Sequence, residues 1–256
     1  MSVEDGFDAE TFAQLAEVEM NSFWFRGRSA LIAKFAQQYF PDTNAMAEIG
    51  CGNGAVMVAL AETFPNSFVT GMDAHAEALV EARARVGPDA RLIQGDALHL
   101  PFRDEFDLVG AFDVIEHIVE DKLALASFYA ALKPGGGLMI AVPAHMILWS
   151  ASDTYSHHVR RYERRELREK IEDAGFDVLR ITSFVSLLFP ALLLQRLWGR
   201  LSSSSGAQGG SLLPQFGLNR LFDAIMSIER WLILRGISFP VGGSLLVVAR
   251  KKSSGS

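Results

Sequence analysis

Cysteine is nearly absent from this sequence: Cys51 is the only one among 256 residues. A single thiol excludes an internal disulfide framework and a multi-cysteine zinc site, and it fits a reducing compartment. A long apolar run is also missing. The uncharged stretch 134–152 is interrupted by Pro143 and His145, and the uncharged stretch 201–219 is rich in Ser and Gly. A bilayer span needs roughly 20 apolar residues in a row. The acidic N-terminus does not resemble a signal peptide, so we expect a cytoplasmic protein.

Positive charge is scarce as well, because 24 Lys and Arg face 30 Asp and Glu, for a net charge of −6. This balance argues against a nucleic-acid partner. The charge is uneven, however. Residues 181–256 hold eight basic and two acidic residues, a net charge of +6, which leaves −12 for residues 1–180. Since this basic part also contains the apolar run 181–195, we expect it to form a surface with a role of its own.

Short apolar runs alternate with helical patterns through the middle of the chain. This alternation predicts an α/β fold with a doubly wound parallel sheet, in a single domain over residues 1–256. The helices are expected at 29–40, 54–63, 76–86, 121–132 and 163–174. The strands are expected at 45–50, 67–73, 91–96, 106–113, 137–142, 177–184 and 244–250.

Residues 185–240 predict a helical, apolar and basic insertion between the last two strands. It contains a polar loop, 202–211, and a helix, 220–235, that Asn219 could cap. The apolar positions expected on one face of this helix are Leu221, Phe222, Ile225, Ile228 and Leu232. Three interpretations stay open: a lid over an acceptor pocket, a protein-binding surface, or a weak peripheral membrane contact through residues 184–235.

The strongest local motif is Glu48-Ile49-Gly50-Cys51-Gly52-Asn53-Gly54, which closes a strand and opens a helix. Glycines there allow a sharp turn and the close approach of a ligand, and the helix start offers free N–H groups. A tight turn without a ligand and a dinucleotide-binding loop are both consistent with the motif alone.

Three acidic residues narrow the choice. Asp73 follows the second strand and can accept hydrogen bonds from ribose hydroxyls. Asp96, after the third strand, could accept one from an adenine amino group. Glu48 would repel a pyrophosphate but attract a cationic sulfonium or ammonium group. The charges therefore favour a positively charged adenosine cofactor.

Four segments together resemble the successive motifs of class I S-adenosylmethionine-dependent methyltransferases: AEIGCGNG (47–54), GMD (71–73), GDALHLPF (95–102) and FDLVGAFDVIEHI (106–118). The resemblance implies a Rossmann-like, seven-stranded, mostly parallel sheet with an antiparallel last strand. It also implies S-adenosyl-L-methionine as cofactor and S-adenosyl-L-homocysteine as product. The cofactor contacts that it implies are Glu48, Gly50, Cys51, Gly52, Gly54, Asp73, Ala74, Asp96, Ala97 and Phe112.

Two flanking segments, FWFRGR (23–28) and HVRRY (158–162), resemble those of one subgroup of the family. The first implies that Arg26 binds the cofactor carboxylate; the alternative is an apolar lid with Arg26 and Arg28 in solvent. The second places the acceptor near the fifth strand. The residues that it implies there are Trp149, His158, Arg161 and Tyr162. The interspersed glutamates predict instead that Arg164, Arg165 and Arg168 form a solvated helix face.

His117 and His158 are the candidate catalytic residues, because a neutral imidazole can accept a proton from a hydroxyl acceptor. We expect no metal site, since the six histidines show no ligand spacing in the sequence. The sequence thus predicts methyl transfer to a small-molecule or lipid-like acceptor that carries an apolar part, at oxygen or nitrogen. A non-catalytic cofactor-binding module and an NAD-dependent oxidoreductase are the alternatives.

Overall fold

A computed structural model describes residues 23–194 and 219–253. These residues form one seven-stranded sheet in the order β3-β2-β1-β4-β5-β7-β6. β7 is antiparallel to both β5 and β6, and the other pairs are parallel. The strands are β1 (Ala45–Ile49), β2 (Phe68–Asp73), β3 (Arg91–Gln94), β4 (Phe106–Phe112), β5 (Leu132–Pro143), β6 (Phe176–Phe184) and β7 (Ser244–Lys251). The predicted fold class, a doubly wound and mostly parallel sheet, is confirmed.

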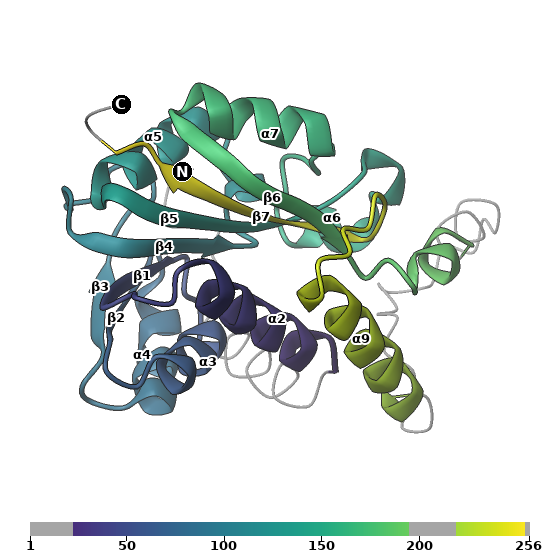
Figure 1. The fold of residues 1–256 in the computed structure, drawn as a ribbon, viewed down its shortest axis with the longest axis horizontal. Coiled ribbons are helices and arrows are strands. Elements are labelled where there is room, and N and C mark those ends of the chain that lie inside the picture. Colours follow the sequence, from purple (N-terminus) through teal and green to yellow (C-terminus); the bar gives the residue numbers. More distant parts are fainter. Residues whose placement is uncertain (1–22, 195–218, 254–256) are drawn as a thin grey trace.

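Helices cover both faces of the sheet (Figure 1). One face carries α2 (Phe23–Tyr39), α3 (Ala55–Thr63), α4 (Ala76–Val86) and α9 (Asn219–Leu234), and the other carries α5 (Asp121–Ala131) and α7 (Arg164–Asp173). Three short elements follow β4 and β5: η2 (Ile115–His117), η3 (Met146–Leu148) and α6 (Ala151–Tyr155). The sequence patterns did not predict these three, because each is too short to show a period.

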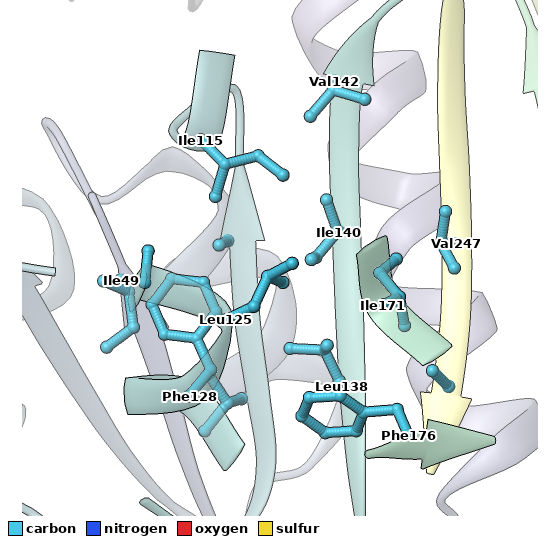
Figure 2. Close-up of a cluster of buried hydrophobic side chains, with 14 of the residues drawn as sticks. Ile49, Ile115, Leu125, Phe128, Leu138, Ile140, Val142, Ile171, Phe176 and Val247 are labelled. Atoms are coloured by element: carbon cyan, nitrogen blue, oxygen red, sulfur yellow. The ribbon is translucent and has the colours of Figure 1, made fainter. Parts of the chain in front are cut away.

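The core beneath α5 and α7 fixes the position of the β4 edge (Figure 2). Leu125 and Phe128 of α5 are fully buried in the same cluster as Ile49, Leu138 and Ile115. Each side chain of this size contributes about 1.5–3 kcal/mol when it is fully buried. Because Ile115 begins η2, the core holds the turn that presents the next two residues at the edge of the sheet.

Two predicted boundaries are wrong. α2 already begins at Phe23, so the FWFRGR segment lies inside the helix and does not precede it. β5 begins at Leu132 and runs through the Pro-Gly-Gly-Gly segment that was expected to be a turn. The glycines permit close packing there, because a Cβ on Gly137 would lie 2.4 Å from the ring of Phe40.

The described part of the predicted insertion connects β6 to β7. α9 packs against α2, where a Cβ on Gly27 would lie 3.8 Å from Met226. The buried positions of α9 are Met226, Glu229 and Ile233, while Leu221 and Ile228 are exposed, so the expected inward face is wrong in part.

The loop 202–211, together with Arg196 and Arg200, lies outside the described residues, and the extent of the insertion stays a prediction. Among the described helices, none is both long and apolar enough to cross a membrane.

Candidate active site

The glycine loop joins β1 to α3 and is bent by three left-handed glycines. Gly50, Gly52 and Gly54 have φ of +70°, +52° and +80°. The backbone N–H groups of Gly50 and Cys51 donate to the Met72 carbonyl at 2.7 and 3.0 Å, which ties the loop to β2. A Cβ on Gly52 would meet no atom within 4 Å, so the loop presents open space there.

Asp73 ends β2 and holds the loop from the other side. One carboxylate oxygen accepts the Gly52 N–H at 2.8 Å, and the other accepts the His75 N–H at 2.9 Å. Each carboxylate oxygen has a second lone pair. The fixed carboxylate can therefore accept two further hydrogen bonds from a pair of ligand hydroxyls.

Two buried carboxylates, Glu48 and Asp73, give the surroundings of the loop a negative charge. Glu48 is 3% exposed on β1. Burial, together with the charges of Glu48 and Asp73, raises the pKa of the Cys51 thiol. The thiol therefore stays protonated and is not a nucleophile. The negative field favours a ligand with a positive group over one with a pyrophosphate.

The ends of β2 and β3 form the rim of the site. The carbonyl oxygen of Ala74 accepts a hydrogen bond from the Gln94 side chain at 3.0 Å, which joins the two strand ends. Asp96 is exposed and accepts the Leu98 N–H at 2.9 Å. Ala97 is partly buried against the core. These residues lie where the family motif implies an adenine, and their contact with it stays a prediction.

The aromatic and basic candidates near β4 lie differently from what the sequence indicated. The ring of Phe112 is 5% exposed and folds back over Gly110 into the core. Arg26 is exposed and forms an ion pair with Asp223 of α9 at 2.8 Å. Arg28, which the alternative interpretation of this segment placed in solvent, is buried and pairs at 2.7 Å with Asp113 directly after β4. Arg28 is thus the arginine of this segment that faces the strand edge.

η2 follows directly, and it presents Glu116 and His117. Glu116 is fully buried, and burial together with the charge of Asp113 raises its pKa. Burial and the nearby ring of His158 lower the pKa of His117 to about 4. The rings of His117 and His158 meet edge to face, with centroids 4.7 Å apart. Both predicted histidines therefore lie together beside the β4 edge.

Asp153 organises the segment after β5. Its carboxylate oxygens accept from the Ser150 N–H at 2.8 Å and from Arg161 at 2.7 and 3.1 Å. The His158 Nδ1 atom lies 2.9 Å from the same group. Burial alone would raise the pKa of Asp153, but the hydrogen bonds from His158 and Arg161 hold it well below its usual range. Asp153 therefore stays ionised at neutral pH, and it contacts both His158 and Arg161.

The other predicted acceptor contacts have structural partners. Trp149 is half-buried, and its indole N–H donates to Thr154 at 3.3 Å. Tyr162 is fully buried, and its hydroxyl donates to Asp121 at 2.7 Å. Arg161 donates to the Ala144 carbonyl at 3.1 Å as well as to Asp153. Tyr162 and Arg161 therefore stabilise the segment after β5 through these hydrogen bonds.

The expected solvated face of α7 is confirmed for two of its three arginines. Arg165 and Arg168 form exposed ion pairs with glutamates one turn away. The expectation is wrong for Arg164, which is half-buried and donates to the carbonyl oxygens of Ile181 and Phe239. Sequence spacing could not show this, because both acceptors come from distant segments.

Comparison with known proteins points to one family. A model of the family described as "Methyltransferase domain" matches residues 46–136, which include the glycine loop, Asp73, Asp96 and η2. A Mycolicibacterium smegmatis protein named "Probable S-adenosylmethionine-dependent methyltransferase" is 29% identical over 171 residues, 66% of this chain and 63% of that protein. A trans-aconitate 2-methyltransferase from Deinococcus radiodurans is 35% identical over 98 residues, 38% of this chain and 37% of that protein. The chain thus spans less than two thirds of the length of these relatives.

Solved structures with a similar fold also include a methyltransferase complex. A chain of a complex that contains the Haloferax volcanii Trm112 methyltransferase activator superposes with a TM-score of 0.65 at 22% identity, over 100% of both chains. An identity this low supports the fold alone. The glycine loop, the acidic strand ends and the match over residues 46–136 together support a class I S-adenosylmethionine-dependent methyltransferase.

Proposed function

We propose that this protein transfers the methyl group of S-adenosylmethionine to an oxygen or nitrogen atom of a small acceptor that carries an apolar part. The observation that carries the proposal is the Asp73 carboxylate, fixed by the Gly52 and His75 N–H groups at the end of β2. One of its oxygens lies against the loop at Gly52, where a Cβ would meet no atom within 4 Å, and the other is held by His75.

The residues present fit that cofactor. The donor set is one of carboxylates and backbone N–H groups, which suits ribose hydroxyls and a cationic tail. When bound, S-adenosylmethionine supplies an electrophilic methyl group on a sulfonium. The described residues around the loop have to orient the cofactor and exclude water, so that the acceptor atom meets the methyl group at about 3 Å.

The acceptor side is formed by η2 and the segment after β5. His117 is neutral at pH 7 because burial lowers its pKa to about 4. His158 is oriented by Asp153. The segment after β5 also carries exposed apolar side chains, namely Met146, Ile147 and Val159. These apolar side chains support an acceptor with an apolar part, and in the absence of a bound ion the two rings supply lone pairs where a proton has to leave an acceptor hydroxyl.

Isothermal titration calorimetry with S-adenosylhomocysteine tests the cofactor site. We expect Asp73→Ala to weaken binding by about 1–3 kcal/mol, through the loss of charge-assisted hydrogen bonds. Asp89→Ala, which removes an exposed carboxylate away from the strand end, is the matched control and should bind normally. Equal affinity in both variants would contradict the role of Asp73.

A second variant tests the acceptor side. His158→Ala should lower turnover by about 10²–10⁴-fold on an oxygen acceptor and leave the affinity for S-adenosylhomocysteine unchanged. Turnover close to that of the wild type would remove His158 from the reaction.

A further inference from the structure

Glu116, His117 and His158 form a cluster that the sequence did not predict. Each offers one donor atom, a carboxylate oxygen or an imidazole nitrogen, and these three atoms lie within 4.8 Å of one another. Two of the residues belong to η2 at the end of β4, and the third follows α6. Because β4 and β5 are neighbours in the sheet, the segments after them meet at the same edge.

Glu116 lacks the partners that a buried carboxylate requires. It is fully buried, and among the described residues neither of its carboxylate oxygens has a hydrogen-bond partner. The charges of Arg28 and Arg161 act on Glu116, but the ion pairs of these arginines are formed with Asp113 and Asp153. A buried charge without a partner is strongly disfavoured, and a cation is the group that satisfies it.

Both histidines are oriented as metal ligands usually are. The Nδ1 atom of His158 faces Asp153 at 2.9 Å, so its Nε2 atom carries the free lone pair. The His117 ring hydrogen-bonds to the backbone at Ser156 and His157, which occupies one of its nitrogens. Metal-bound histidines almost always donate their second ring N–H to a carboxylate or a backbone carbonyl.

We propose that Glu116, His117 and His158 bind one divalent transition-metal ion. A set of two histidines and one glutamate holds Zn²⁺ in sites that keep a position open for a ligand. Donor atoms around a tetrahedral Zn²⁺ lie roughly 3.4 Å apart, so donor atoms that lie within 4.8 Å of one another can reach one ion with a small movement of the side chains. Resting on the proposed methyl transfer, the open position takes a hydroxyl oxygen of the acceptor and lowers its pKa. The proton then goes to water, and with the ion bound the two rings act as ligands and not as bases.

Metal titration of the full chain tests the site. After removal of metals by chelation, the wild type should bind one Co²⁺ with visible d–d absorption and one Zn²⁺ by calorimetry, with Kd in the micromolar range or below. Glu116→Gln and His158→Ala should each weaken binding at least 100-fold. The matched control is His157→Asn, which replaces the exposed neighbouring imidazole and should bind as the wild type does.

A thermal measurement guards against misfolded variants. Zn²⁺ should raise the Tm of the wild type and of His157→Asn but not that of Glu116→Gln, since an ion stabilises only the state that binds it. No stoichiometric binding by the wild type, or equal binding by all variants, would overturn the site.

S-adenosylhomocysteine binding, measured on the same samples, separates the two proposals. If the wild type binds metal but not S-adenosylhomocysteine, the proposed methyl transfer fails and the metal site stands. The reverse result removes the metal site alone.

Discussion

At the scale of single residues, Gly50 is the loop position where an added side chain would collide most closely with a neighbour. Its φ is +70°, and a Cβ would lie 2.4 Å from a methyl carbon of Val114. Gly50→Ala therefore has to move either the loop or the turn that leads into η2. We expect it to destabilise the fold by about 1–3 kcal/mol and to weaken S-adenosylhomocysteine binding at least tenfold, as measured by denaturation and calorimetry.

Gly87→Ala is the control that separates the effect of backbone strain from the effect of a steric collision with Val114. Gly87 also has a positive φ, +84°, but a Cβ there would meet no atom within 4 Å. It should lower stability by about 1 kcal/mol and leave S-adenosylhomocysteine affinity unchanged. If Gly50→Ala binds as tightly as Gly87→Ala, the contact with Val114 does not matter for the site.

Asp121 gives a residue-scale prediction on pH. It is buried, and Arg160 and Tyr162 donate to it at 2.6 and 2.7 Å, beside Lys170. Burial alone would raise its pKa, but the hydrogen bonds from Lys170 and Tyr162 lower it below the ordinary value of 3.8. A depressed folded-state pKa stabilises the fold above the unfolded-state value, and this contribution disappears as the pH falls through the folded value.

Asp121→Asn should therefore cost about 3 kcal/mol near pH 7, because it leaves buried cations without their anion. Urea denaturation of both proteins at several pH values measures the difference. It should stay constant above about pH 5 and shrink as the pH falls below about 4. A difference that does not depend on pH would refute this account of Asp121.

At the scale of elements, the segment from η3 to His158 depends on one carboxylate. Asp153 accepts from Ser150 in the capping box of α6, lies against His158 and pairs with Arg161. Asp153→Asn should raise hydrogen exchange throughout residues 146–162 and leave the amides of β1 and β4 protected. Exchange that rises equally in the sheet would show that Asp153 stabilises the whole fold.

α9 presents a different kind of element. Leu221, Ile228 and Trp231 are about half exposed, and Arg235 stacks over the Trp231 ring at 3.9 Å. Sedimentation should show weak, salt-sensitive binding to anionic vesicles, since each basic residue near such a surface adds roughly 1 kcal/mol. Trp231→Gln should reduce it, and Val80→Gln, an exposed apolar control on α4, should not. No binding to vesicles would leave α9 as a cover over α2.

At the scale of the whole molecule, the sequence predicted what local pattern determines. The order of strands and helices follows from apolar periodicity and from glycine and proline positions, and the loop at Gly50 is a local motif. The burial of Arg28 and Arg164 was missed because their partners, Asp113 and Phe239, lie far along the chain. Only tertiary packing brings such groups together.

The cluster of Glu116, His117 and His158 was missed for the same reason. Ligand spacing along the chain does not show the cluster, because Glu116 and His158 are far apart in the sequence. The available signal was positional: Glu116 and His117 follow β4, His158 follows β5, and these strands are neighbours. Parallel neighbours bring the segments after their carboxyl ends to one edge, which is where ligands bind in open α/β sheets.

The central claim is that the glycine loop binds a cationic adenosine cofactor. Calorimetry of the wild-type chain with S-adenosylhomocysteine and, separately, with NAD tests it most directly. The acidic set of Glu48, Asp73 and Asp96 predicts a micromolar Kd for S-adenosylhomocysteine, about −8 kcal/mol, and binding of NAD at least 100-fold weaker. Tight binding of NAD without binding of S-adenosylhomocysteine would contradict the claim.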